Sequence, residues 1–175
     1  MSACAEARAA SAPLDLADYD HADCLIYGIG NVGRQDDGLG WAFIDWLEEA
    51  GLCPSAARQR HYQLQLEDAD LLRHQRKVLF VDATRDPSVT DFRVECPRPA
   101  MDFSFTSHAL SIPALLATCA QCFGYLPEAR LLVLRGYAWE LKQGLTPRAQ
   151  KNLGAAQACL APRSPHPFES KRSQA

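Results

Sequence analysis

The chain has 175 residues, of which 47% are hydrophobic and 22% are charged, and its formal net charge at pH 7 is −3. This composition excludes a largely disordered chain, and the length indicates one domain that can fold without disulfides or a structural metal. The lack of a basic excess argues against a nucleic-acid partner, and no apolar run approaches the length of a membrane span.

Seven cysteines are scattered through the sequence, and no secretory signal pattern precedes them. We therefore expect free thiols and a cytoplasmic location. The first 21 residues lack hydrophobic periodicity, and the last 14 are rich in proline and polar side chains. We expect a flexible leader over 1–21, a single α/β domain over 22–161 and a disordered tail over 162–175.

Strand and helix patterns alternate along the domain. In chain order, we predict a strand over 24–29, a helix over 38–50, a strand over 61–66, a short helix over 67–75, strands over 77–83 and 91–97, a helix over 111–123, a strand over 130–137 and a helix over 146–161. The expected fold class is α/β: a three-layer sandwich with a mostly parallel twisted sheet, helices on both faces and one antiparallel edge strand.

A glycine-rich segment, GIGNVG (28–33), follows the first predicted strand and precedes a helix, which is the pattern of a dinucleotide-binding loop. Asp36 and Asp37 then stand where that helix begins. Two carboxylates there would repel a pyrophosphate and compete for the free N–H groups that bind it. A cation is therefore the favoured ligand of this loop, although both aspartates can also serve simply as helix caps.

Two further residues lie on strand-to-helix connections. Asp82 ends the apolar strand KVLFVDA, and His108 precedes the helix that starts near residue 111. Each alone is compatible with a turn or cap residue. In a parallel sheet, however, such connections open at one edge, so Asp37, Asp82 and His108 can converge between the carboxyl ends of the first and third strands. Two carboxylates and one imidazole suit nickel, zinc, manganese or iron.

The other candidates point to structural roles. Cys119 and Cys122 form a C-x-x-C pair inside a predicted apolar helix, which favours a buried structural pair. Tyr137 and Trp139 follow the last strand, where they can line a peptide groove or only pack on the surface. We expect the segment 98–107 to flank the site and to move when a peptide binds.

In this order, GIGNVGRQDDGLG, VLFVDA and SFTSHALS resemble the hydrogenase maturation proteases, as do RGYAWEL and LTPRAQKNL near the end of the domain. The resemblance runs from about residue 23 to residue 161. It implies a protease-like domain that removes a C-terminal extension from the large-subunit precursor of a nickel–iron hydrogenase. An aspartate stands at position 37, where the family frequently has glutamate.

The resemblance also implies the site. Asp37, Asp82 and His108 would be both the catalytic set and the metal ligands, with Asp36 in a supporting role. Nickel would arrive with the precursor, and another divalent cation could replace it in vitro. The metal would polarise the scissile carbonyl or activate a water, or Asp36 or Asp37 would act as a general base. The expected partner is the hydrogenase large-subunit precursor, with no nucleic acid and no membrane, and the expected state is a monomer.

Two alternatives remain open at this point. The first is a non-catalytic, nickel-sensing chaperone or adaptor of hydrogenase assembly that uses the same ligands. The second is a nucleotide-binding module built on Gly30 and Gly33.

Overall fold

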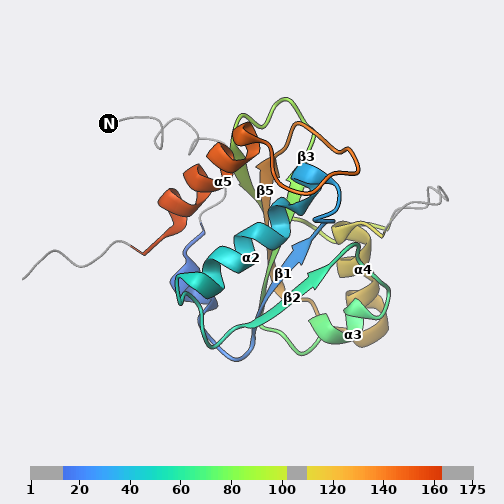
Figure 1. Cartoon of the computed structure of the whole chain (residues 1–175). Coiled ribbons are helices and arrows are strands. Elements are labelled where there is room, and N and C mark those ends of the chain that lie inside the picture. Colours follow the sequence, from blue (N-terminus) through green and yellow to red (C-terminus); the bar gives the residue numbers. More distant parts are fainter. Residues whose placement is uncertain (1–13, 102–109, 163–175) are drawn as a thin grey trace, which may run out of the picture.

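A computed structural model describes residues 14–101 and 110–162. It contains a five-stranded sheet in the order β2-β1-β3-β5-β4 (Figure 1). The strands are β1 (Cys24–Ile29), β2 (Ala57–His61), β3 (Lys77–Thr84), β4 (Phe92–Glu95) and β5 (Glu128–Arg135). All neighbouring strands are parallel except β4 and β5, which pair antiparallel at one edge. The predicted mostly parallel sheet with one antiparallel edge strand is confirmed.

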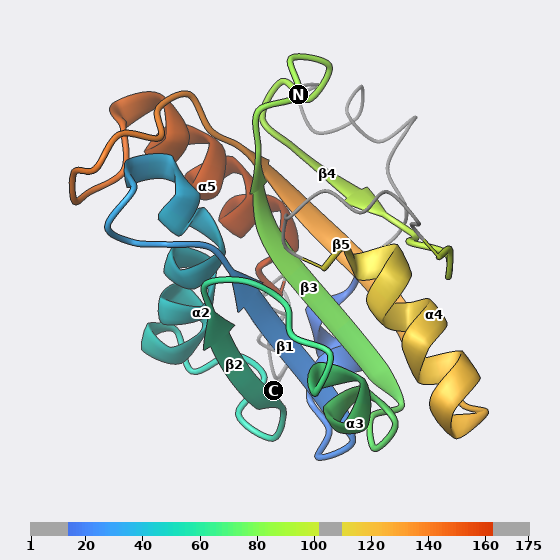
Figure 2. The ribbon, with the colours of Figure 1, turned by 90° about the vertical axis from the view of Figure 1, so that its right-hand side faces the viewer.

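Helices cover both faces of the sheet, and Figure 2 shows α2 and α5 on one side with α3 and α4 on the other. The helical elements are η2 (Leu16–Tyr19), η3 (Gln35–Gly38), α2 (Leu39–Glu49), α3 (Asp68–Leu72), α4 (Ile112–Phe123) and α5 (Pro147–Leu160). Two apolar cores separate these layers: α2 and α5 bury one face of the sheet, and α3 and α4 bury the other. The expected three-layer α/β sandwich is therefore confirmed.

Local signals explain the elements that were predicted most closely. Residues Val78–Val81 of β3 are fully buried because helices cover both faces of this central strand. The Ser111 hydroxyl accepts a hydrogen bond from the Ala114 N–H at the start of α4, and Thr146 caps α5 in the same way. Gly124 ends α4 with a φ of +63°, which glycine adopts without steric cost.

The strand predicted over 61–66 is wrong, because β2 ends at His61 and residues 62–66 form a loop. The alternating apolar pattern misled the prediction: Leu64 is 5% exposed, but Tyr62 and Leu66 are 64% and 63% exposed. The true strand is polar because it lies at the sheet edge, where Arg60 forms ion pairs with Asp45 and Glu48 of α2. β5 also begins and ends two residues earlier than predicted, since the chain turns away at Gly136.

The expected flexible leader does not extend to residue 21. Residues 16–19 form η2, and Leu16 and Tyr19 are 1% and 2% exposed in the core beneath α2 and α5. Two apolar side chains are enough to dock this short segment, although it has no helical periodicity. Residues 1–13 and 163–175, including nearly all of the expected tail, lie outside the described residues.

The expected buried C-x-x-C pair is only half correct, because Cys119 is buried and Cys122 is exposed on α4. Five cysteines of the described chain form no disulfide: Cys24, Cys53, Cys96, Cys119 and Cys122. Across residues 14–101 and 110–162, none of the helices has the length and apolar character needed to cross a bilayer.

Candidate functional site

The strand order creates a crevice at the carboxyl edge of the sheet. From β1 the chain passes to β2 on one side, and then to β3 on the other side of β1. Ligands of open α/β sheets bind where the strand order reverses in this way, outside the carboxyl ends of the strands. The residues that follow β1 and those that end β3 therefore meet at one place.

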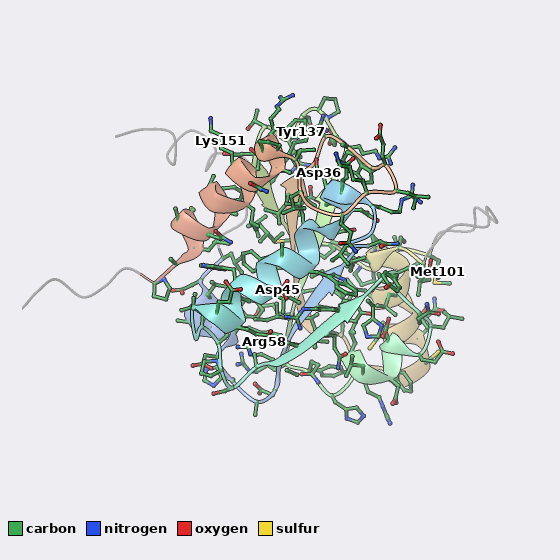
Figure 3. All side chains as sticks on the ribbon, in the orientation of Figure 1. Asp36, Asp45, Arg58, Met101, Tyr137 and Lys151 are labelled. Carbon is green, nitrogen blue, oxygen red and sulfur yellow. The ribbon has the colours of Figure 1, made fainter. Side chains whose placement is uncertain are left out.

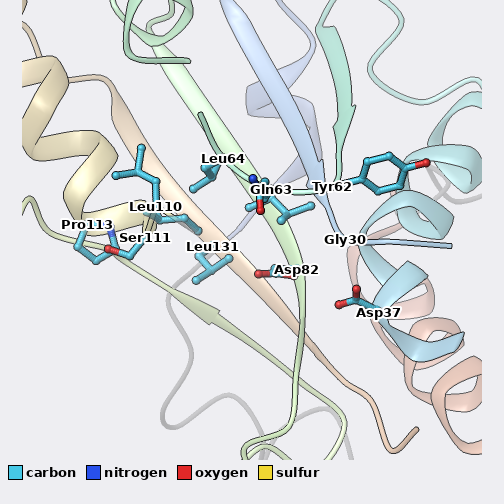
Figure 4. A pocket seen from close by; sticks show the side chains of 12 residues that line it. Gly30, Asp37, Tyr62, Gln63, Leu64, Asp82, Leu110, Ser111, Pro113 and Leu131 are labelled. Atoms are coloured by element: carbon cyan, nitrogen blue, oxygen red, sulfur yellow. The ribbon is translucent and has the colours of Figure 1, made fainter. Parts of the chain in front are cut away.

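A pocket of about 410 Å³ opens at this place (Figure 4). One part of it, which we call the acid end, contains Asp37 and Asp82. The other part, the apolar end, is lined by Leu64, Leu110, Ile112, Pro113 and Leu131. In Figure 4, Asp82 lies between the leucines and Asp37. The structure thus brings the two predicted carboxylates to one pocket.

Asp82 follows Phe80 on the face of β3 that packs under α3 and α4, so its carboxylate emerges where this core ends. The backbone N–H of Ala83 donates a hydrogen bond to it at 2.8 Å. Burial is the main cause that raises the pKa of Asp82 from 3.8 to about 7; the Ala83 hydrogen bond opposes the shift, and the nearby charge of Asp37 adds to it. The acid end therefore holds a carboxyl group that gives up its proton near neutral pH.

Asp37 belongs to η3 and is half-buried at the pocket wall. Burial raises its pKa, while the Arg34 guanidinium and a hydrogen bond from the Trp139 side chain act in the opposite direction. Trp139 is itself fixed, because the Arg85 guanidinium lies 4.4 Å from the centre of its ring. The indole therefore lies beside the Asp37 carboxylate at the pocket wall.

Asp36 has a different role from its neighbour, since it is 0% exposed, does not line the pocket and is bonded to the loop after β5, where Tyr137 lies (Figure 3). Its carboxylate accepts four hydrogen bonds: from the backbone N–H groups of Tyr137, Ala138 and Thr146, at 2.8, 3.1 and 2.7 Å, and from the Thr146 hydroxyl at 2.8 Å. The expected supporting role fits this geometry. The alternative in which Asp36 acts as a general base is wrong, because both oxygens are occupied and no substrate can reach them.

The glycines of the loop serve close packing. Gly30 has a φ of +133°, and a Cβ there would lie 1.8 Å from the Asp37 carbonyl oxygen, which accepts a hydrogen bond from the Asn31 N–H. A Cβ on Gly28 would lie 2.8 Å from the Gly40 carbonyl oxygen of α2, and a Cβ on Gly40 would lie 2.3 Å from the Ile29 carbonyl oxygen and 2.5 Å from that of Val81. These glycines let the loop close on itself and bring α2 against β1 and β3, so the pattern at 28–33 has a packing explanation that requires no phosphate.

His108, the third predicted ligand, lies outside the described residues, as does most of the segment 98–107. The described chain resumes at Leu110, which lines the pocket, and the Ala100 N–H donates a hydrogen bond to the Pro113 carbonyl at 3.0 Å. The two ends of the undescribed stretch thus meet beside α4. Within residues 14–101 and 110–162, no three His, Cys, Asp or Glu side chains gather closely enough to hold a metal ion.

Sequence reasoning missed several residues of the site. The sequence does not decide between a groove and a surface role for Trp139, which the structure places beside Asp37. Tyr62, Gln63 and Leu64 line the pocket, although the sequence predicted a strand there. The sequence does not indicate Leu131 as a site residue, because a leucine in an apolar strand is expected to lie in the hydrophobic core.

No protein-family model matches the chain, and no curated protein matches it either. Solved structures do match. The hydrogenase maturation protease HycI from Thermococcus kodakarensis is 18% identical with a TM-score of 0.60, covering 79% of this chain and 92% of its own.

Two structures from Escherichia coli give similar values. The endopeptidase HycI is 18% identical with a TM-score of 0.58, covering 78% of this chain and 88% of its own. The hydrogenase maturating endopeptidase HybD is 16% identical with a TM-score of 0.56, covering 78% of this chain and 91% of its own. The chain therefore has the fold of the solved hydrogenase maturation proteases, as the motifs predicted.

Proposed function

We propose that the chain is an endopeptidase that removes the C-terminal extension from the large-subunit precursor of a nickel–iron hydrogenase. The observation that carries this proposal is the meeting of Asp37 and Asp82 in one pocket, at the strand-order reversal of a fold shared with solved maturation proteases. The five unpaired cysteines favour a reducing cytoplasm as the place of action. We further propose that the protein acts as a monomer.

In this proposal nickel arrives bound to the precursor, and Asp37, Asp82 and His108 complete its coordination. The electrostatics of the acid end support a cation ligand. Burial and mutual repulsion raise the pKa of Asp82 to about 7, so a divalent cation has only a loosely held proton to displace at neutral pH. Carboxylate and imidazole are suitable ligands for nickel, and for other divalent ions in vitro.

Coordination of the precursor's nickel by these residues also explains why the protein would select nickel-loaded precursor over precursor without nickel. A precursor without nickel forfeits the coordination energy and leaves two carboxylates facing each other across the pocket. For bond cleavage, the precursor's metal would polarise the scissile carbonyl or activate a water, and Asp37 would be the carboxylate of the adjacent pair that can take a proton, because it lines the pocket. After cleavage the large subunit can close over its metal.

Mass spectrometry of a purified nickel-loaded precursor, incubated with the protein, tests this function. The wild type should shorten the precursor by its tail, whereas Asp37→Asn, Asp82→Asn and His108→Ala should each lose most of this activity. Asp45→Asn, an exposed site on α2, is the control and should cleave normally.

Three results would contradict the proposal. Full tail removal by all three site variants would refute the assignment of the ligands. Stable, nickel-dependent association of the wild type with the precursor, without any change in precursor mass, would instead support the chaperone or adaptor. Binding of NAD or ATP that is lost on substitution of Gly30 or Gly33 would support the nucleotide-binding module.

A further inference from the structure

The pocket extends well beyond the two carboxylates that the proposed function uses. Its apolar end is built by side chains from three separate parts of the chain: Leu64 from the loop after β2, Leu131 from β5, and Leu110 and Ile112 from the loop before α4 and its first residue. Figure 4 shows Leu110 and Leu131 on the side of Asp82 that faces away from Asp37. A metal held at the acid end leaves this second half unfilled.

The polar groups of this wall are largely occupied. Pro113 has no N–H group, and the Ala114 N–H is bound by the Ser111 hydroxyl. The start of α4 therefore presents mainly hydrocarbon to the pocket, even though helix N-termini ordinarily attract polar ligands. Leu110 and Leu131 are only half-buried, so apolar surface at this end remains in contact with water until something covers it.

Continuity with the acid end determines what kind of group can cover it. Both ends belong to one pocket of about 410 Å³, a size that accepts a coordinated group together with a neighbouring side chain. A peptide whose backbone passes the acid end must place an adjacent side chain either into the leucines or out into solvent. An apolar side chain buried there gains the hydrophobic contribution, whereas a charged one loses its hydration without a partner.

We propose that the apolar end is a specificity subsite that receives one apolar side chain of the substrate peptide, close in sequence to the residue read at the acid end. Leu131 and Leu110 are the specificity-determining residues, because they are the leucines of the wall that are only half-buried. This inference rests on the proposed protease function and adds to it the side-chain class that the enzyme selects.

A substrate panel crossed with pocket variants tests the subsite. In the nickel-loaded precursor, each of the four positions on either side of the scissile bond is replaced in turn by Ala, Leu, Phe and Asp. At one position the wild type should prefer Leu to Asp by more than tenfold in kcat/KM. Leu131→Ala should enlarge the subsite and shift the Phe-to-Leu ratio at that position about tenfold toward Phe, without altering selectivity elsewhere.

Leu110→Ala is a second variant in the loop before α4, where truncation removes less of the core, and it should shift the same ratio in the same direction. Leu126→Ala, an exposed leucine outside the pocket lining, is the control and should leave every ratio unchanged. Circular dichroism and thermal unfolding establish that each variant is folded, and a ratio between two substrates of one variant is independent of its active fraction.

Uniform loss of kcat/KM across the panel in both variants would overturn the subsite, because it would mean a purely structural role. Cleavage by the wild type with no apolar preference at any position would also overturn it while leaving the protease function intact. Failure of the wild type to cleave any precursor would overturn the protease function and the subsite together.

Discussion

The two ends of the pocket are held in place by different means. The acid end depends on a buried carboxylate, Asp36, whose four hydrogen bonds tie η3 to the loop after β5 and so place Trp139 against Asp37. The apolar end depends on hydrophobic contact and on a few local bonds around Asp68 and Ser111. Metal ligands need fixed positions, whereas an apolar wall needs only shape, and this difference predicts how far each end tolerates substitution.

The largest effect is expected at Asp36. Asp36→Ala leaves four buried hydrogen-bond donors, which lie in the loop after β5 and at Thr146, without an acceptor. The free energy of unfolding should therefore fall by about 4 kcal/mol. Asp45→Ala, which removes an exposed ion pair with Arg60, should cost less than about 1 kcal/mol. Urea unfolding followed by circular dichroism measures both variants. Equal losses would contradict the assigned role of Asp36.

The next largest effect concerns pH and Asp82. Between about pH 4 and pH 7 the unfolded chain releases a proton that the folded protein retains at Asp82, because the folded pKa is about 7 and the unfolded value is 3.8. Wild-type stability should therefore fall as pH rises through this window. Asp82→Asn has no such loss and, without metal, should be more stable than the wild type by up to roughly 4 kcal/mol at pH 8. The difference should vanish toward pH 4.

Asp86 is a control of opposite sign for this measurement. The N–H and hydroxyl of Ser88 hold the pKa of Asp86 below its ordinary value, so its contribution to stability is present at neutral pH and is lost as pH falls. Thermal unfolding of both variants across this range should show Asp82→Asn gaining stability and Asp86→Asn losing it at neutral pH. A destabilised Asp82→Asn at pH 8 would show that the acid end does not strain the metal-free protein.

A smaller effect is expected at Trp139. Trp139→Phe keeps an aromatic ring beside Arg85 but removes the N–H that holds Asp37, so kcat/KM on nickel-loaded precursor should fall about tenfold. Because the lost hydrogen bond lowered the pKa of Asp37, the acid limb of the pH–rate profile should move to higher pH. Trp46→Phe, on α2 and outside the pocket lining, is the control. An unmoved acid limb in Trp139→Phe would contradict the contact.

The smallest effect is expected at the loop of the apolar end. The Tyr27 hydroxyl donates to Asp68 at 2.7 Å, and Asp68 also accepts the Gln65 N–H at 2.8 Å. Tyr27→Phe should cost about 1 kcal/mol of stability and speed hydrogen exchange over residues 63–66. Tyr125→Phe, which removes a hydroxyl that donates to the Gln75 carbonyl, should cost a similar amount without affecting exchange in that loop. Identical exchange in the two variants would count against the anchor.

Elements whose structure is determined by their own residues were predicted well, whereas elements that depend on contacts with distant residues were not. β1, β3, α4 and α5 follow from apolar runs and capping residues that lie within each element. β2 was misplaced because an edge strand is partly solvated and carries polar side chains, while an alternating loop beside it imitated a strand. η2 was missed because its order comes from the core beneath α2 and α5 rather than from its own sequence.

The same distinction applies to the site. Asp82 was predictable because an acid at the end of a buried strand must emerge at the carboxyl edge of the sheet. The different roles of Asp36 and Asp37 followed only from the family resemblance and not from the local sequence, because they depend on a loop about a hundred residues later in the chain. The position of Trp139 beside Asp37 depends on the same loop after β5, because this loop, which is bonded to Asp36, carries the indole to the pocket.

The central claim is that Asp37 and Asp82 act together on one divalent cation. A double-mutant cycle tests this claim most directly, with kcat/KM for tail removal from nickel-loaded precursor as the measured quantity. The account predicts that Asp37→Asn and Asp82→Asn each remove most of the activity and that the double variant is little worse than either one, because losing one ligand already abolishes the shared coordination. Additive losses in kcat/KM would contradict the claim, since they would mean that the two carboxylates act independently.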